Sequence, residues 1–191
     1  MTISDDLAYI IGVLLGDGSV SSCKDGHYTI QLSVTSKKFA LEFFSSLKRI
    51  GLNPHIAVFP PPKPSRLRNG KVIIPKKKQY RVRAYSKKFV LWFKKLTFEE
   101  IERMLNCKML QAAFVRGIYE SEGNIRKDSR GNRRIVIANT NLELLKLVQK
   151  ILYKWGVYAT ISDSPKYQLR FFRSKDIQNF LKITRPCIKR G

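Results

Sequence analysis

Two carboxylates stand at matching places in the chain and have the chemistry of a paired metal site. Asp17 lies near the end of the apolar segment 7–18, and Glu122 holds the same place in a degenerate copy of it, 112–123. At the ends of two adjacent helices, such acids would face the negative helix pole and repel each other, so neither helps folding. A divalent cation relieves both costs, and Mg²⁺ prefers hard oxygen ligands of this kind. Two such ions would stabilise the attacking and leaving oxygens of phosphodiester hydrolysis.

Small residues predict how the two acids meet. Alanine, glycine or serine recurs at every fourth position of both segments, and such rows let two helices approach backbone to backbone. The rows are Ala8, Gly12 and Gly16 in the first segment and Ala113, Gly117 and Ser121 in the second. We expect a helix interface at Ala8, Gly12, Ala113 and Gly117, with the acids side by side at its end. The alternative is an ordinary packed helix pair ending in acid–glycine turns; repetition of the pattern favours the metal site.

The copy extends well beyond these segments. With a shift of 105 residues, Gly26 falls on Gly131 and Gly51 falls on Gly156, and glycines mark special backbone positions. The register slips afterwards, and the first half carries extra residues within 60–78. This proline- and lysine-rich stretch predicts a long basic loop with a short strand at 72–74. It is either a disordered insertion or a loop that contacts DNA.

Each half predicts the same order of elements: a helix, a strand, a second helix, two strands and a closing helix. After the first helices we expect strands at 28–35 and 134–139, helices at 37–50 and 141–155, strands at 55–59, 79–85, 157–163 and 167–173, and helices at 87–96 and 175–183. The sequence therefore predicts an α+β fold built from two tandem units. Their boundaries are 1–97 and 109–191, with a partly helical linker at 98–108.

The charge of the chain points to a polyanionic partner. Lys and Arg number 37 against 14 Asp and Glu, a formal net charge of +23. Such an excess repels itself unless an anion relieves it, and nucleic acid is the leading partner. A membrane is disfavoured, because no apolar run is long enough to span a bilayer and the basic residues form no amphipathic helix. Three widely separated cysteines and no secretion signal predict an intracellular protein.

Strand alternation predicts which face meets that partner. In 28–35 and 79–85 apolar residues alternate with Thr, Gln, Ser and Arg, so one face packs under helices and the other stays polar. Arg and Gln read guanine and adenine in the major groove through paired hydrogen bonds. In the second half, Arg134, Val136 and Ala138 are expected on this face. The candidate DNA-binding residues are Thr29, Gln31, Ser33, Gln79, Arg81, Arg83, Tyr85, Arg126, Arg134, Asn139, Gln168 and Arg170. An ordinary solvated sheet face is the alternative.

The segments 10–18 and 115–123 resemble the two motifs of LAGLIDADG homing endonucleases. The repeat covers nearly the whole chain, so the chain is similar to the single-chain, two-motif members, such as those encoded in archaeal ribosomal RNA introns. The resemblance implies an αββαββα fold in each half, a pseudo-twofold axis, and antiparallel sheets that form a DNA-binding saddle. It implies a monomer in an archaeal cytoplasm or an organelle matrix.

The same resemblance implies Mg²⁺-dependent cleavage of both strands of a double-stranded DNA target, leaving 3′ overhangs. Asp17 and Glu122 take the catalytic acidic positions, and Gly16 and Ser121 complete the metal-binding set. Mn²⁺ or Ca²⁺ would occupy the same sites, Ca²⁺ without supporting cleavage. Polar or basic residues around the acids are candidates for organising water: Lys24, Gln31, Arg126, Lys127 and Asn139.

The main competing function is nucleic-acid binding without cleavage on the same fold. One form is an RNA maturase that acts on intron RNA, and another is a DNA-binding regulator. Retention of both acids favours cleavage, although it leaves maturase activity possible in addition. A generic RNA-binding protein is a weaker alternative, because the aromatic residues fall mainly on expected core positions and form no exposed stacking stripe.

Overall fold

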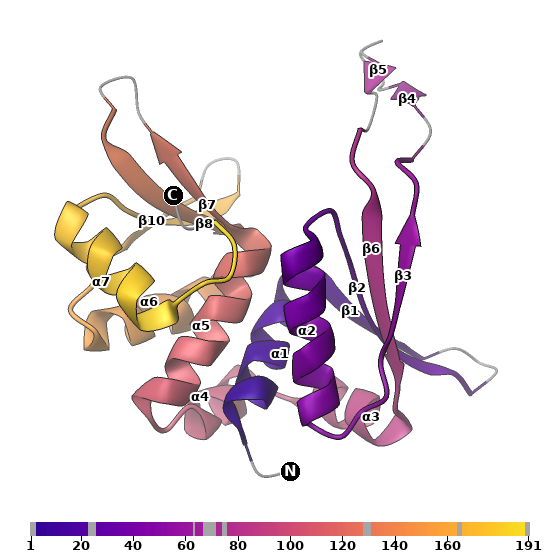
Figure 1. Ribbon diagram of the computed structural model, residues 1–191. Coiled ribbons are helices and arrows are strands. Elements are labelled where there is room, and N and C mark those ends of the chain that lie inside the picture. The colour runs from indigo at the N-terminus through magenta and orange to yellow at the C-terminus, as the bar shows by residue number, and fades with distance from the viewer. Residues whose placement is uncertain are drawn as a thin grey trace.

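The structure, a computed structural model, describes residues 3–22, 26–62, 64–66, 72–73, 76–127, 131–163 and 166–189. The predicted α+β class is confirmed (Figure 1). The elements in chain order are α1 Asp5–Leu15, β1 Gly18–Ser22, β2 Tyr28–Val34, α2 Lys37–Arg49, β3 His55–Phe59, β4 Ser65–Arg66, β5 Val72–Ile73, β6 Gln79–Tyr85, α3 Lys87–Lys95, α4 Phe98–Met104, α5 Lys108–Glu122, β7 Gly123–Lys127, β8 Arg133–Asn139, α6 Leu142–Lys154, β9 Thr160–Ser162, β10 Tyr167–Phe171 and α7 Ser174–Thr184.

Each half contains a four-stranded antiparallel sheet of the same topology. The strand orders are β1-β2-β6-β3 and β7-β8-β10-β9. The first half also carries the short pair β4-β5, which lies inside the predicted insertion. Only the first two residues of the strand predicted at 72–74 are described, and residue 74 lies outside the described residues. The insertion therefore adds a small hairpin at one end of the first sheet (Figure 1).

The two halves form their second helices with the same local signals. Ser36 and Asn141, which are 105 residues apart, accept backbone hydrogen bonds from Phe39 and Leu144 and so cap α2 and α6. The chain leaves these helices through Gly51 and Gly156, whose φ angles are +83° and +71°. Glycine adopts this left-handed conformation without the steric cost that a side chain brings. The predicted ends of both helices are confirmed.

The alternation of polar and apolar residues did not predict the strands that follow the two acids, β1 and β7. β1 and β7 begin directly beside the acids, and β1 pairs with β2 from Gly18↔Leu32 to Ser22↔Tyr28. Its residues are mostly serine and carry no apolar alternation, so pairing with β2, not propensity, makes it a strand. The αββαββα pattern implied by the family resemblance did include these strands.

The strand predicted at 157–163 is wrong in its first part. Val157 and Ala159 are buried, but β9 begins only at Thr160. The reason lies in α7, where the Asp176 carboxylate accepts a hydrogen bond from the Tyr158 backbone N–H at 3.3 Å. That N–H is therefore satisfied by a side chain and not by a neighbouring strand.

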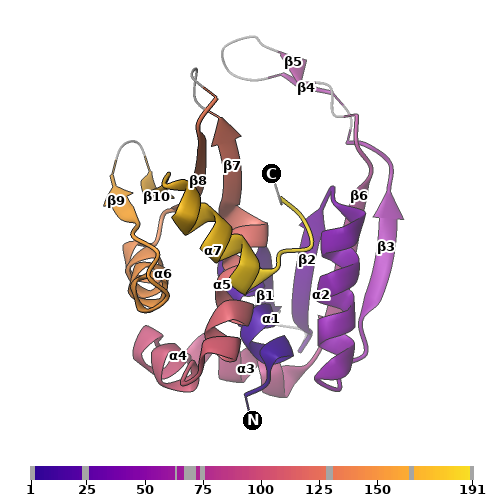
Figure 2. The same cartoon turned by 60° about the vertical axis from the view of Figure 1, so that its left-hand side comes forward.

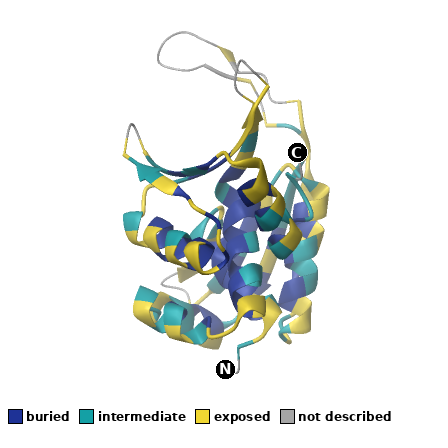
Figure 3. Ribbon diagram, turned by 90° about the vertical axis from the view of Figure 1, so that its left-hand side faces the viewer, coloured by how far each residue is buried: buried dark blue, intermediate teal, exposed yellow. Residues whose placement is uncertain are grey.

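The core is centred on α1 and α5, which run side by side between the two sheets (Figures 1 and 3). A β-carbon added to Gly12 would lie 2.3 Å from the Phe114 carbonyl oxygen, and one added to Gly117 would lie 2.4 Å from that of Tyr9. Both neighbours are backbone atoms and cannot turn away. The two glycines therefore allow a helix separation that any side chain would prevent.

The sheets bury one face and expose the other, as alternation predicts. The side chains of Ile30, Leu32, Val82 and Ala84 in the first half are fully buried, as are those of Ile135, Ile137 and Leu169 in the second. Val136 lies on the same face as Arg170, as expected, yet it is only 4% exposed. Val136 pairs with Asn124 on one side and Arg170 on the other, and these longer side chains flank it.

Among the described residues, no helix is long and apolar enough to cross a membrane.

Candidate functional site

The ends of α1 and α5 meet in tight contact and bring the two acids together. A β-carbon on Gly16 would lie 2.4 Å from the Ser121 Cβ and 3.3 Å from the Glu122 Cγ. Asp17 and Glu122 therefore leave their helices at the same place, one turn beyond the Gly12–Gly117 crossing. The negative charge of Asp17 reaches Glu122 strongly enough to raise its pKa.

The electrostatics of the two acids are compatible with a bound cation. Burial is the largest cause of the raised pKa of both carboxyl groups, and Asp17 adds to it at Glu122. Lys189 acts in the opposite direction on both, and Lys166 does so on Glu122. Two partly desolvated acids that disfavour each other's charge gain from a bound cation, which is the physical basis of the sequence prediction.

Asn139 is placed beside Glu122 and not out on the sheet face. Its side-chain amide donates to Glu122 Oε1 at 3.3 Å, and its carbonyl oxygen accepts from the Asn141 backbone at 2.8 Å. Of the other candidates around the acids, Arg126 and Lys127 are exposed on β7. Gln31 is bound to Arg83, and Lys24 lies outside the described residues.

Sequence reasoning missed Lys189, although its charge acts on both acids. Its ammonium donates to the carbonyl oxygens of Glu120 and Ser121 at 2.7 and 2.8 Å. Burial lowers the pKa of this lysine, while Asp17, Glu122 and Glu120 raise it. The residue is 67 positions beyond Glu122 and belongs to no motif, so no sequence signal places it here.

Glu120 is a second residue that the sequence did not single out. It is 1% exposed, and its carboxylate accepts from the Tyr9 hydroxyl at 2.7 Å, Arg116 Nε at 3.1 Å and the Cys187 backbone N–H at 2.5 Å. Arg116 also pairs with Glu42 of α2 at 2.9 Å. The network ties α1, α2 and α5 to the segment after α7. A glutamate at the position where the first segment has Leu15 was the available signal.

The polar sheet faces carry the residues predicted to bind DNA. Arg83 Nε donates to Gln31 at 2.6 Å across β6 and β2, and Arg170 donates to Gln168 at 2.8 Å within β10. The Arg81 guanidinium lies over the Phe59 ring at 4.4 Å, and its buried Nε has no hydrogen-bond partner. The remaining candidates are at least partly accessible to solvent: Thr29, Ser33, Gln79, Tyr85, Arg126 and Arg134.

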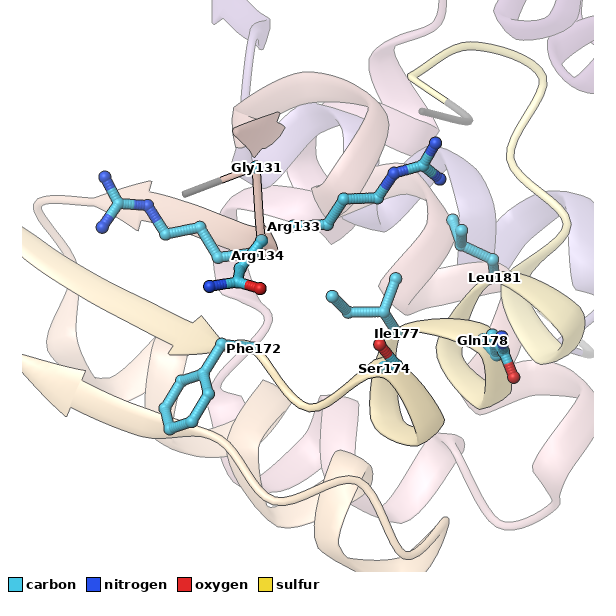
Figure 4. Close-up of a pocket in the computed structure, with 9 residues that line it drawn as sticks. Gly131, Arg133, Arg134, Phe172, Ser174, Ile177, Gln178 and Leu181 are labelled. Carbon is cyan, nitrogen blue, oxygen red and sulfur yellow. The ribbon is translucent and has the colours of Figure 1, made fainter. Parts of the chain in front are cut away.

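Two pockets flank this surface. One, of about 310 Å³, lies beside Asp17 and is bounded by Ser33, Gln79 and Lys189 among others. A larger one, of about 710 Å³, lies at the outer end of the second sheet and does not include the acids. Figure 4 shows that Arg133 and Arg134 point away from each other there, with Phe172 beside the latter. The smaller pocket therefore belongs to the acid site, and the larger one does not.

The donor set at the acids fits a divalent cation. Asp17 and Glu122 supply carboxylate oxygens, Gly16 and Ser121 stand directly before them, and the buried Ser121 hydroxyl has no hydrogen-bond partner. The Lys189 ammonium, itself a cation, binds the Ser121 carbonyl oxygen at the end of α5. No cluster of three or more His, Cys, Asp or Glu side chains suited to a metal exists among the described residues. Water and phosphate oxygens would therefore have to complete the coordination, as in open catalytic sites.

Comparison with known proteins gives the same family in both halves. Residues 4–96 and 109–184 match the LAGLIDADG-like domain. Two uncharacterized proteins of Methanocaldococcus jannaschii are similar, one 35% identical over 83% of this chain and the other 28% identical over 98%. The chain spans 57% and 69% of their respective lengths.

Solved structures share the fold across almost the entire chain. The homing endonuclease I-DmoI in complex with DNA and Mn has a TM-score of 0.65 at 22% identity, over 96% of this chain and 98% of that one. The N-terminal LAGLIDADG domain of DUF199/WhiA has a TM-score of 0.65 at 18% identity, over 100% and 85%. I-DmoI has also been solved with DNA and Ca, with a TM-score of 0.62 and 22% identity.

Proposed function

The chain belongs to the LAGLIDADG-like domain family, and we propose that it is a site-specific DNA endonuclease. It cuts both strands of a double-stranded target by metal-dependent hydrolysis. The observation that carries this proposal is the placement of Asp17 and Glu122 together at the ends of two helices, between two polar sheet faces. A protein that only binds DNA has no need of two partly buried acids that repel each other.

The sheet faces bind the target. Arg81 and Arg83 of the first half and Arg170 of the second contact base edges, and their charges contribute to the large positive excess that attracts the phosphate backbone. Gln31 and Gln168 hold two of these guanidinium groups in place. Such preorganisation reduces the entropy lost when the arginines bind. The target runs across both sheets, so that its two strands lie near the two acids.

The acids bind Mg²⁺ or Mn²⁺, with Gly16 and Ser121 completing the protein ligands. When bound, the metal stabilises negative charge on the reacting phosphate and lowers the pKa of water. Asp17 and Glu122 would each supply carboxylate oxygen, and the positions not filled by the protein would be open to water and phosphate. Asn139 orients Glu122. The similarity to I-DmoI, solved with DNA and Mn or Ca, supports this assignment through the fold alone.

The finer assignments are part of the same proposal. The units 1–97 and 109–191 act as two half-sites within one monomer, and cleavage leaves 3′ overhangs. The protein is of the intron-encoded kind, acts inside the cell, and resembles the enzymes of archaeal ribosomal RNA introns. DNA that joins the sequences flanking the gene is the natural substrate to test, because a homing enzyme cuts the uninterrupted site.

The test compares Asp17→Asn and Glu122→Gln with the wild type on that joined duplex and on sites selected by binding from a random duplex library. Each substitution should reduce the cleavage rate in Mg²⁺ by at least about 100-fold, because a charged group aimed at the reacting phosphate is lost. Binding measured in Ca²⁺ should change little. Asp5→Asn, at the opposite end of α1, and Glu143→Gln, exposed on α6, remove the same charges away from the site and should leave cleavage intact.

Two outcomes would oppose the proposal. Full cleavage by the Asp17→Asn, Glu122→Gln double variant would remove the acids from the chemistry. Tight binding of a selected duplex without any cleavage by the wild type, in Mg²⁺ or Mn²⁺, would instead assign the chain to the non-cleaving DNA binders.

A further inference from the structure

The segment 185–189, which we call the strap, crosses from the second half to the junction of the halves. It leaves the end of α7, where Arg185 has a φ of +45°, and runs toward α2 and β2 (Figure 2). Cys187 lines a pocket with residues of α2, and Ile188 and Lys189 line the pocket beside Asp17. The strap is thus part of the wall of the acid site.

Two hydrogen bonds to α5 fix the path of the strap. The Cys187 backbone N–H donates to the buried Glu120 carboxylate at 2.5 Å, and the Tyr119 hydroxyl donates to the Lys189 carbonyl oxygen at 2.7 Å. The Tyr119 ring is held in turn by an edge-to-face contact with Phe180 of α7, 5.0 Å between centroids. The backbone of Lys189 is therefore positioned from consecutive residues of α5.

The side chain of Lys189 ends at the place where a cation would bind. Its ammonium donates to the carbonyl oxygens of Glu120 and Ser121 at 2.7 and 2.8 Å, at the negative pole of α5. Both acids attract it. Since Ser121 is a proposed metal ligand and immediately precedes Glu122, the ammonium binds a backbone oxygen at the proposed metal site.

We propose that Lys189 is a tethered cation of the acid site, which holds the two carboxylates together without metal and which a divalent ion must displace from the Ser121 carbonyl oxygen. The proposal rests on the proposed metal-dependent function. Two positive groups on one carbonyl oxygen repel each other at short range, so ammonium and metal bind this oxygen in turn. Lys189 is therefore a positioning residue that weakens metal binding to the free protein.

The experiment measures Mn²⁺ binding to the full chain without DNA, by the loss of the free Mn²⁺ electron paramagnetic resonance signal. Lys189→Met keeps the length of the side chain and removes the competitor, and it should bind Mn²⁺ about tenfold more tightly. That factor corresponds to the low end of the range for a hydrogen bond to a charged group. Lys182→Met, exposed on α7, removes the same charge outside the site and should leave the affinity at the wild-type value.

A second variant separates displacement from a simple change of charge. Tyr119→Phe keeps the ring against Phe180 and removes the hydrogen bond that anchors the strap. It should tighten Mn²⁺ binding by about twofold to threefold, since the ammonium is held less firmly while the charge is unchanged. Circular dichroism of each variant reports whether the fold is retained.

The outcomes distinguish this inference from the proposed function. If the wild type binds Mn²⁺ through Asp17 and Glu122, but Lys189→Met binds it equally or more weakly, the displacement is wrong and the metal site stands. If Asp17→Asn and the wild type bind Mn²⁺ with equal affinity, the metal does not bind at the acids and both proposals fail. Equal tightening by Lys182→Met and Lys189→Met would also overturn the inference, because general charge would then explain it.

Discussion

The ends of α1 and α5 take matching places in the two halves, but they differ in backbone and in chemistry. α1 ends at Leu15, two residues before Asp17, whereas α5 continues through Glu122. Two residues before its acid, α1 has the partly buried Leu15, whereas α5 has the fully buried Glu120. The difference extends one turn back, where Ile11 of α1 corresponds to Arg116 of α5. Symmetry in this fold thus covers the helix crossing and the acids, while Glu120, Arg116 and the strap that Glu120 holds belong to the second half alone.

The two sheets differ in a similar way. The first sheet carries an uninterrupted polar stripe across β2 and β6, with Gln31 and Arg83 joined at 2.6 Å. In the second, Val136 interrupts the corresponding face beside Arg170, which is held by Gln168 from its own strand. If the proposed function holds, the first half reads base edges over a longer stretch than the second, and the target is asymmetric.

Replacing Glu120 by leucine would make α5 resemble α1 at this position and should have the largest effect. The change leaves Arg116 without its buried partner and the Cys187 N–H without an acceptor, so we expect a loss of about 3 kcal/mol in the free energy of unfolding. The strap should be released as well. Urea denaturation measures the first effect, and hydrogen exchange of the Cys187 amide measures the second.

Glu42→Gln is the matched control, because it removes the solvent-accessible partner of the same arginine. Its cost should be below about 1 kcal/mol. If both substitutions lowered the free energy of unfolding equally, the buried Glu120 carboxylate would stabilise the fold no more than the accessible Glu42 carboxylate. The chemical difference between the ends of α1 and α5 would then make no difference to stability.

Arg83→Ala and Arg170→Ala test the contrast between the sheets, with a somewhat smaller effect. Each should relax preference at its own base pair by about 1–3 kcal/mol, measured from the binding of single-base variants of a selected duplex. More positions should be affected by Arg83→Ala, because it frees Gln31 on the neighbouring strand, whereas Arg170→Ala frees Gln168 on its own strand. Arg103→Ala on α4 serves as a control for lost charge. Uniform weakening on all duplexes would make both arginines phosphate contacts and remove the proposed asymmetry of reading.

Local signals in the sequence predicted the repeated elements well. The 105-residue repeat with its glycines and the alternation around Leu32 each reflect a short-range rule that the structure obeys. Propensity failed for β1, whose serines become a strand only through pairing with β2. It also failed before β9, where a side chain of α7 takes the backbone N–H of Tyr158.

In the candidate site, too, local spacing predicted some residues, whereas others depend on contacts between segments distant in sequence. Gly12 and Gly117 could be placed opposite each other because small residues at helical spacing have one main use in a packed pair. Glu120 and Lys189 could not, since their partners lie 111 and 68 residues away in sequence. Their roles depend on where the strap crosses the helices, and nothing in the local sequence encodes that crossing.

Glu122→Gln should change stability least, and its sign follows from the pKa shift. Burial and the charge of Asp17 raise the pKa of Glu122 above its ordinary value of 4.5 in the folded protein. The folded chain therefore retains a proton that the unfolded chain has already lost, and stability falls as pH rises through this window.

Metal-free Glu122→Gln protein should melt about 2 °C above the wild type at neutral pH, and the difference should vanish in acid, where both forms are neutral. Asp17→Asn should give a smaller gain, because burial alone raises the pKa of that group. The opposite result would be a wild type that is more stable than both variants at neutral pH in EDTA. It would mean that the Lys189 ammonium already offsets the repulsion between the two carboxylates, so that the acids do not destabilise the metal-free fold.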